Sequence, residues 1–395
     1  MAHAISRNGP IRIGVLYATS GVTSAVETSQ QQATLLAIDE INAAGGVLGR
    51  ELLPVCVDPA CTPRHYAAFS EALILEQGVR LLMGCYMSST RKAVIPVVER
   101  HNALLFYATP YEGFEFSRNV FYAGAAPNQN ILPLAAYMLS RHGPRVAMVG
   151  SDYVCPYESN RVLTDLLAER RGTKVCEDYL PLDAPFEAFQ AVAARITRQR
   201  PDFIFSTVVG AGIVHLHRAL AEAGVDPYAT PVASHMSSES EVAAMGHDLA
   251  EGLVTCASYY QSIASAENQR ALALHRARFG EAGVPNVCWE AAYFQMHLLA
   301  LAMARAGSDE PTHVARAMPG LEFNAPQGRV QVDAHNSHTS LHPRIGRCNA
   351  RGQFDVLAAA PQRVAADPYV VSHQLPAWAV GAHVGTTLEA ATEVQ

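Results

Sequence analysis

The chain has 395 residues, enough for two domains of ordinary size, and 49% of them are hydrophobic against 16% charged. The formal net charge is -7 and no basic block occurs, which argues against direct binding of nucleic acid. No run of 18 apolar residues occurs, so no membrane span is expected. No apolar secretory segment precedes the strand-like run at Ile11, which favours a cytoplasmic location and leaves the compartment to be argued from function.

Short apolar runs alternate with helical periods through the first 110 residues. The segment 29–46, for example, has apolar residues at helical spacing and ends at a pair of glycines. Strands and helices are predicted in turn over 11–18, 29–46, 51–58, 63–77, 79–86, 90–102 and 103–109. This alternation is typical of a parallel, doubly wound sheet.

The same alternation restarts after Asn130, with predicted strands over 145–152, 173–182, 202–209 and 230–235. Two doubly wound, Rossmann-like α/β lobes are therefore predicted, with a ligand cleft between them where the carboxyl ends of the strands meet. Beyond residue 250 the sequence predicts a strand, a long helix and further strands, over 252–260, 288–307, 328–340 and 342–357.

The usual catalytic and cofactor motifs are absent. The sequence has no GxSxG, no GxxxxGK[ST], and no GxGxxG after the first strand. His335, His338 and His342 form the densest histidine cluster, but their spacing fits no standard zinc pattern and there is no HExxH. We therefore predict no enzyme activity, no cofactor and no metal. The eight cysteines are irregularly spaced, which favours free thiols over a disulfide framework.

Two predicted strands end in small polar residues, one helix apart. Ser88 follows the first of these strands, and Thr109 ends the second. Either group can act as a nucleophile or simply hold a ligand, and no base can be assigned to activate Ser88. Ser88 can also cap the helix predicted over 90–102.

These residues belong to longer runs that resemble a known family. The chain is similar to the amide-sensing negative regulators of aliphatic amidase operons. They have the type I periplasmic-binding-protein fold, close to the leucine- and urea-binding proteins of ABC transporters. The runs that carry the resemblance are GCYMSSTRKAVIPVVER (84–100), YATPYEGFEFSRNVFYAGAAPNQN (107–130), GSDYVCPYESN (150–160), FSTVVGAG (205–212), NAPQGRVQVD (324–333) and DPYVVSH (367–373).

The resemblance implies two lobes joined by three crossings. The amino-terminal lobe would comprise 1–124 plus 258–334, and the carboxyl-terminal lobe 125–257 plus 335–380. Residues 381–395 would form a loose tail. The crossings would lie near residues 124–128, 257–259 and 336–338.

The resemblance also implies a ligand pocket, in which two positions depart from the family. A pocket tyrosine is replaced by Cys155, and a threonine by Met236, beside which Ser237 can supply a hydroxyl. The pocket residues carried over are Tyr86, Ser88, Tyr107, Thr109, Pro110, Tyr153, Cys155 and Met236. Neutral hydroxyls and aromatic walls of this kind suit a primary amide, which needs both donors and acceptors but no charge.

By this resemblance the protein is a cytoplasmic sensor of a short aliphatic amide or a related neutral molecule. It would control an RNA-binding antiterminator protein of the response-regulator-like type, without touching nucleic acid itself, and would tend to self-associate. The alternative is the substrate-binding protein of an ABC transporter for urea, amides or branched-chain amino acids. An amino acid ligand would require an acid for its ammonium group, and Glu239 and Glu241 lie near the appropriate strand end.

Overall fold

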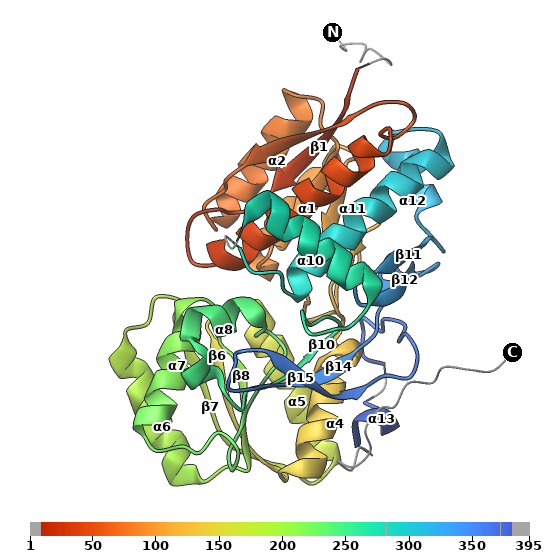
Figure 1. Ribbon diagram of the computed structural model, residues 1–395. Coiled ribbons are helices and arrows are strands. Elements are labelled where there is room, and N and C mark those ends of the chain that lie inside the picture. The colour runs from red at the N-terminus through yellow and green to blue at the C-terminus, as the bar shows by residue number, and fades with distance from the viewer. Residues whose placement is uncertain (1–8, 281–282, 372, 381–395) are drawn as a thin grey trace, which may run out of the picture.

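The computed structural model describes residues 9–280, 283–371 and 373–380, and they form two α/β lobes that lie one above the other (Figure 1). The amino-terminal lobe contains a five-stranded sheet in the order β2-β1-β3-β4-β5, with every neighbouring pair parallel. Its strands are β1 (Ile11–Leu16), β2 (Leu52–Val57), β3 (Leu81–Gly84), β4 (Leu104–Tyr107) and β5 (Val120–Tyr122). Its helices are α1 (Ser24–Ala43), α2 (Pro63–Leu75), α3 (Ser88–Arg100), α10 (Ala266–Phe279), α11 (Val287–Ala306) and α12 (Pro311–Ala317).

The carboxyl-terminal lobe contains a seven-stranded sheet in the order β15-β14-β10-β9-β8-β6-β7. The strands from β7 to β10 are parallel, and β14 and β15 extend the sheet in antiparallel fashion. The strands are β6 (Arg145–Ser151), β7 (Thr173–Leu180), β8 (Phe203–Thr207), β9 (Val232–Ser234), β10 (Val254–Ala257), β14 (Arg344–Cys348) and β15 (Phe354–Ala359). The helices are α4 (Ile131–Arg141), α5 (Val154–Glu169), α6 (Phe186–Gln199), α7 (Ala211–Glu222), α8 (Glu239–Met245), α9 (His247–Ala250) and α13 (Ala377–Val380).

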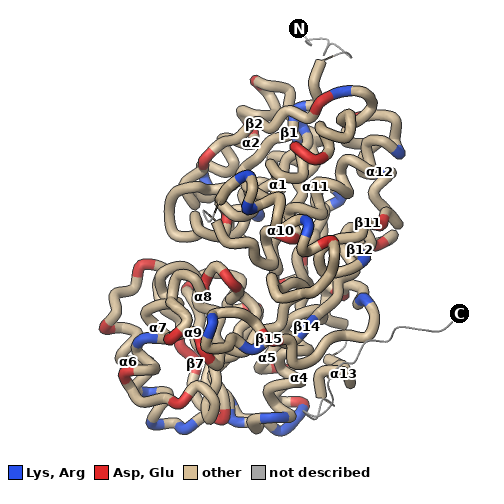
Figure 2. The backbone as a smooth tube through the Cα atoms, viewed as in Figure 1, with Lys and Arg blue, Asp and Glu red and all other residues tan. Residues whose placement is uncertain are grey.

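The predicted fold class, two doubly wound lobes, is thus confirmed. The central strands β3 and β4 are buried along their whole length, as parallel strands covered on both faces must be. Lys, Arg, Asp and Glu are spread over both lobes (Figure 2). Among the described residues, no helix combines the length and the apolar character needed to cross a membrane.

Three connections join the lobes. The first follows β5 and includes the short 3-10 helix η1 (Pro127–Gln129), and the second joins β10 to α10. The third lies between β13 (Thr339–Ser340) and β14, a little after the predicted 336–338. This is because β13 still pairs with β12 (Gly328–Val332), itself paired with β11 (Glu322–Ala325), in a small antiparallel sheet. The predicted tail, 381–395, lies outside the described residues.

His338 packs beside the third connection in an aromatic stack. Its ring lies 4.4 Å from that of Tyr122 and 5.6 Å from that of Tyr111, centroid to centroid. The Tyr111 hydroxyl lies 2.5 Å from Nε2 of His338, and Nδ1 lies 2.5 Å from the carbonyl oxygen of Asn336. Nδ1 must donate to that carbonyl, and in the neutral ring Nε2 then accepts from the tyrosine. Burial lowers the pKa of His338 to about 4.

Because the His338 ring is neutral in the folded state, we predict that the protein loses stability in acid. Because the folded-state pKa is depressed below the usual 6.5, this contribution is present above pH 6.5 and lost as the pH falls towards 4. At about 1.4 kcal/mol per pKa unit, the shift from 6.5 to about 4 makes the loss about 3–4 kcal/mol at most. Urea unfolding at pH 7 and pH 4.5 should therefore show a steeper acid loss for the native chain than for His338→Gln. Equal losses in the two proteins would contradict this assignment.

Candidate functional site

A small pocket lies between the two lobes, at the carboxyl ends of their parallel strands. Its volume is about 10 Å³, room for about one water molecule. The lining residues are Val26, Tyr86, Thr109, Pro110, His235, Met236, Ser238, Glu241, Val287 and Cys288. Because the two lobes supply opposite walls, anything larger than a water molecule must shift the lobes, or the side chains on their walls, as it enters.

Four of the eight residues predicted for the pocket line it. Tyr86, Thr109 and Pro110 come from the amino-terminal lobe, and Met236 from the carboxyl-terminal lobe. The structure therefore brings together strand ends that are far apart in the sequence, including one of the two positions that depart from the family. Their contact with a ligand stays a prediction.

The hydroxyl of Thr109 is held in place by a side chain of α1. Gln30 Nε2 on α1 donates both to Thr109 Oγ1 and to the carbonyl oxygen of Ala108, each at 3.0 Å. Both Gln30 and Thr109 are buried. A fixed hydroxyl at the pocket wall binds with less entropic loss than a mobile one.

Ser88 lies outside the pocket lining. It is the first residue of α3, whose N-cap is Met87, so the prediction that Ser88 caps this helix is wrong. Its hydroxyl donates to Oε2 of Glu112 at 2.5 Å and accepts from Arg91 at 3.2 Å. Because α3 begins two residues earlier than predicted, Ser88 and Arg91 lie three positions apart in one turn, where their side chains can meet.

Arg91 is the centre of a buried network beneath the site. Its side chain is 0% exposed and forms ion pairs with Glu112 at 2.9 Å and with Glu115 at 2.7 Å. The guanidinium also lies between two rings, 4.7 Å from the centroid of Tyr107 and 4.8 Å from that of Tyr111. The network fixes the segment that leads from Thr109 to the first connection.

Tyr107, Tyr153 and Cys155 surround this network without lining the pocket. Tyr107 is buried and its hydroxyl donates to the carbonyl oxygen of Tyr86 at 2.6 Å, so it supports a pocket residue. Tyr153 is the N-cap residue of α5, and burial, then Cys155 and Tyr107, raise its pKa. Burial and Glu112 raise the pKa of the Cys155 thiol, which places this carboxyl-lobe residue beside an acid of the opposite lobe.

Glu241 is the charged side chain of the pocket lining. It is the third residue of α8, where its Oε2 accepts from the backbone N and the hydroxyl of Ser238, at 2.8 and 3.1 Å. Oε1 makes no hydrogen bond to another described residue. Burial raises the pKa of Glu241 to about 7. The segment Ser238-Glu239-Ser240-Glu241 has the spacing of a capping box, which is the sequence signal that fixes this orientation.

His235 also lines the pocket and was not predicted from the sequence. Its Nε2 lies 3.2 Å from the hydroxyl of Ser159, whereas its buried Nδ1 has no hydrogen-bond partner among the described residues. Burial lowers its pKa to about 3, so the ring is neutral. The ring adds one donor or acceptor, according to its tautomer, to a wall that already holds a carboxylate.

The arrangement is suited to holding a small molecule. No group of three or more His, Cys, Asp and Glu side chains within the described ranges is arranged to bind a metal ion. The hydroxyl of Ser88 is close to a carboxylate, but Arg91 neutralises that carboxylate and the pair lies outside the pocket. Two lobes with a small, mainly apolar pocket between their strand ends define a ligand-binding protein of the clamp type.

The comparisons with known proteins agree with this class. The chain matches the model of the periplasmic binding protein domain family over residues 11–375, and it belongs to that family. The leucine-, isoleucine-, valine-, threonine-, and alanine-binding protein of Pseudomonas aeruginosa is 23% identical over 327 residues, which cover 82% of this chain and 86% of that protein.

Two solved structures are similar in fold. The solute binding protein of an ABC transporter from Rhodopseudomonas palustris HaA2, in complex with p-hydroxybenzoic acid, has a TM-score of 0.83 at 20% identity and covers 92% of this chain and 100% of its own. The branched-chain amino acid transporter substrate binding protein LivJ from Streptococcus pneumoniae, in complex with isoleucine, has a TM-score of 0.77 at 20% identity and covers 90% and 100%. The relatives are small-ligand binding proteins.

Proposed function

We propose that this protein is the substrate-binding protein of an ABC transporter, and that its ligand is a small molecule with an amino or amide nitrogen. The carboxylate of Glu241 on the wall of the interlobe pocket is the observation that carries this proposal. The family and the transporter proteins among the relatives support it. The protein binds its ligand without chemical change.

A nitrogen donor suits Glu241 better than any other group. A carboxylate buried without a positive partner is costly, which is why its pKa is raised to about 7. An ammonium group supplies a hydrogen bond to Oε1 and the missing positive charge, whereas a neutral amide supplies only the hydrogen bond. A ligand that carries only a carboxylate would meet Glu241 as a like charge or force it to take up a proton. We therefore place amino acids ahead of short amides, and both ahead of aromatic acids.

The remaining wall can bind the other end of such a ligand. Thr109 carries a hydroxyl that donates to the carbonyl oxygen of Cys85 at 3.5 Å and has a lone pair left to accept. His235 carries an Nδ1 without a hydrogen-bond partner among the described residues. Tyr86, Pro110, Met236 and Val287 add apolar surface for an aliphatic side chain. An amino acid or an amide with two to four aliphatic carbons matches this combination.

A ligand screen tests the proposal. Thermal shift and calorimetry with leucine, valine, butyramide, acetamide, urea and 4-hydroxybenzoate should show the strongest binding for an amino acid. Glu241→Gln keeps the shape but removes the charge, and should weaken that binding about 10- to 100-fold, since a hydrogen bond to a charged group contributes about 1.5–3 kcal/mol. The matched control is Glu187→Gln, an exposed acid on α6 of the same lobe.

Two results would contradict the proposal. Strongest binding of 4-hydroxybenzoate would show that the pocket accepts a carboxylate, and unchanged amino acid affinity in Glu241→Gln would show that this carboxylate does not contact the ligand. Equal loss of affinity in the Glu187→Gln control would point to a general effect of surface charge instead.

The amide sensor is a second candidate, favoured by the state of the cysteines. All eight are free thiols, and six of them are buried. Free thiols in this number suit a reducing compartment such as the cytoplasm. In this proposal a short neutral amide controls a response-regulator-like antiterminator protein. Co-purification of such a protein, with release by butyramide but not by leucine, would favour the sensor over the transport protein.

A further inference from the structure

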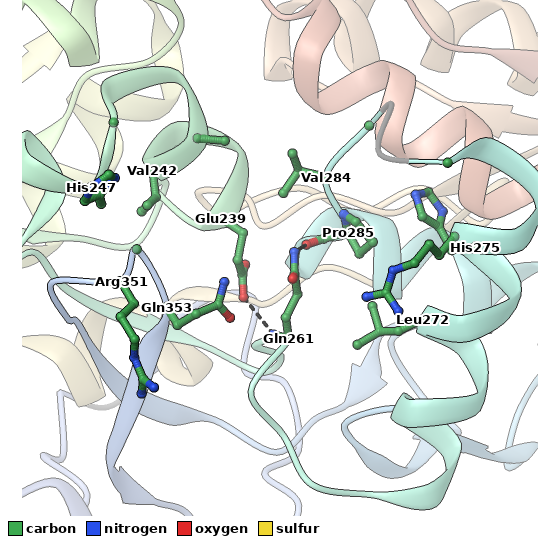
Figure 3. A pocket seen from close by; sticks show the side chains of 16 residues that line it. Glu239, Val242, His247, Gln261, Leu272, His275, Val284, Pro285, Arg351 and Gln353 are labelled. Atoms are coloured by element: carbon green, nitrogen blue, oxygen red, sulfur yellow. Dashed lines mark hydrogen bonds between the residues drawn. The ribbon is translucent and has the colours of Figure 1, made fainter.

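A larger cavity, of about 310 Å³, opens between the lobes (Figure 3). We call it the side cavity. Its carboxyl-lobe wall comes from α8, α9 and the turn 351–353 between β14 and β15, and its other wall from Gln261, α10, Gly280 and the segment 283–285. The charged side chains of this lining are Glu239, Arg276, which has its own partner, and Arg351. The two cavities have no lining residue in common. A molecule in the side cavity would therefore contact both lobes at a place separate from the proposed ligand site.

Glu239 supplies an unused acceptor to this cavity. Its side chain is only 3% exposed. Oε1 accepts from the backbone N of Gln261 at 2.7 Å, whereas Oε2 is buried and has no hydrogen-bond partner among the described residues. Figure 3 shows the carboxylate of Glu239 between Gln261 and Gln353, in the middle of the cavity wall. A buried polar atom without a partner costs free energy in the empty site, which a ligand can recover.

Gln261 adds a second acceptor next to the first. Its Nε2 donates to the carbonyl oxygen of Pro285 at 2.7 Å, which fixes the orientation of the side-chain amide. Its amide oxygen makes no hydrogen bond to another described residue. The two side chains therefore present a carboxylate oxygen and an amide oxygen, and a group with several N–H donors can satisfy both. Burial raises the pKa of Glu239 to about 8, which a positively charged ligand would reverse.

We propose that the side cavity is a second binding site, for a small molecule with a primary ammonium group that donates to Glu239 Oε2 and to the amide oxygen of Gln261. The volume leaves room for a short chain attached to the nitrogen, next to Val242, Leu272 and Val284. Because the walls belong to different lobes, an occupant stabilises the present orientation of the lobes. The site thereby couples a second small molecule to the opening and closing of the interlobe pocket.

Three probes of one shape test the chemistry. Calorimetry or NMR titration of the full chain with n-butylammonium chloride, n-butanol and sodium butyrate compares a cation, a neutral donor and an anion on the same four-carbon chain. We expect saturable binding of n-butylammonium in the micromolar to millimolar range, the ceiling for about five heavy atoms, and at least about tenfold weaker binding of the other two.

Variants then place the cation in the cavity. Glu239→Gln should weaken n-butylammonium binding at least about tenfold, because a charged acceptor becomes neutral. Ala243→Trp introduces a large ring from an exposed position on the cavity wall and should block the site without disturbing the core, so it decides the question if Glu239→Gln folds poorly. The control is Asp248→Asn on α9, whose side chain is 96% exposed, and it should bind as the native chain does.

The proposal is overturned if n-butylammonium does not bind saturably, or if Glu239→Gln and Ala243→Trp bind it as tightly as Asp248→Asn does. It is also overturned if binding is lost in Glu241→Gln while both side-cavity variants retain it. That result would place the ammonium in the interlobe pocket, and so would support the proposed function while excluding the second site.

Discussion

Replacing Arg91 by methionine is expected to lower the free energy of unfolding by about 3–5 kcal/mol. The guanidinium is fully buried between two carboxylates and two tyrosine rings, and methionine fills much of its volume without its charge. The loss comes mainly from the carboxylate of Glu112, which is 2% exposed and, among the described residues, would keep the hydroxyl of Ser88 as its one hydrogen-bond partner. Glu115 loses less, because Lys92 and Tyr122 still donate to it.

Denaturant unfolding followed by circular dichroism measures this effect. The control is Arg100→Met on the same helix, where a guanidinium 64% exposed lies 3.5 Å from Glu71, an arrangement that contributes at most about 1 kcal/mol. The double variant Arg91→Met/Glu112→Gln should recover part of the loss, because it removes the unpaired charge as well. Equal unfolding midpoints for Arg91→Met and Arg100→Met would show that the buried network does not stabilise the lobe.

The fold could be predicted from the sequence because its signals are local. Strands such as β3 and β4 are continuous apolar runs, and helices such as α11 show clear starts and stops, so the alternation that defines two doubly wound lobes is visible along the chain. The run 328–340 is a counterexample. It was predicted as one strand, but the structure divides it into β12 and β13, because Asp333 accepts backbone N–H groups from His335 and Asn336 and turns the chain.

The candidate site could be predicted only in part, because its chemistry depends on contacts across long stretches of chain. The family resemblance led to Thr109 and Met236, which line the pocket. It could not show that the hydroxyl of Ser88 is hydrogen-bonded to Glu112, an acid 24 positions later in the chain. Glu241 was recognised only as an acid near a strand end. Sequence spacing alone does not define the direction of its side chain, which the capping box with Ser238 fixes in the structure.

Replacing Gly124 by alanine is expected to destabilise the protein by about 3 kcal/mol, the upper end of the usual cost of overpacking, and to weaken ligand binding. Gly124 lies in the first connection, where it runs beside the end of β4, and Ala123 N donates to the carbonyl oxygen of Tyr107 there. A Cβ atom at position 124 would lie 1.9 Å from the carbonyl carbon of Thr109 and 2.3 Å from the N of Pro110. These are backbone atoms that cannot rotate away, so the connection and the pocket wall must move apart.

The comparison that isolates this clash is Gly320→Ala. At Gly320 an added Cβ meets nothing within 4 Å, and only the positive φ of 75° opposes the substitution, which costs about 1–2 kcal/mol. In denaturant unfolding, Gly124→Ala should be clearly less stable than Gly320→Ala. Calorimetry with the best ligand of the screen should show weaker binding for Gly124→Ala alone, because Gly124, unlike Gly320, contacts the segment that carries Thr109. If the two variants unfold at the same midpoint and bind equally, the first connection is not packed against the pocket wall in solution. The packing of the first connection would then not explain how Thr109 and Pro110 are held at the pocket wall.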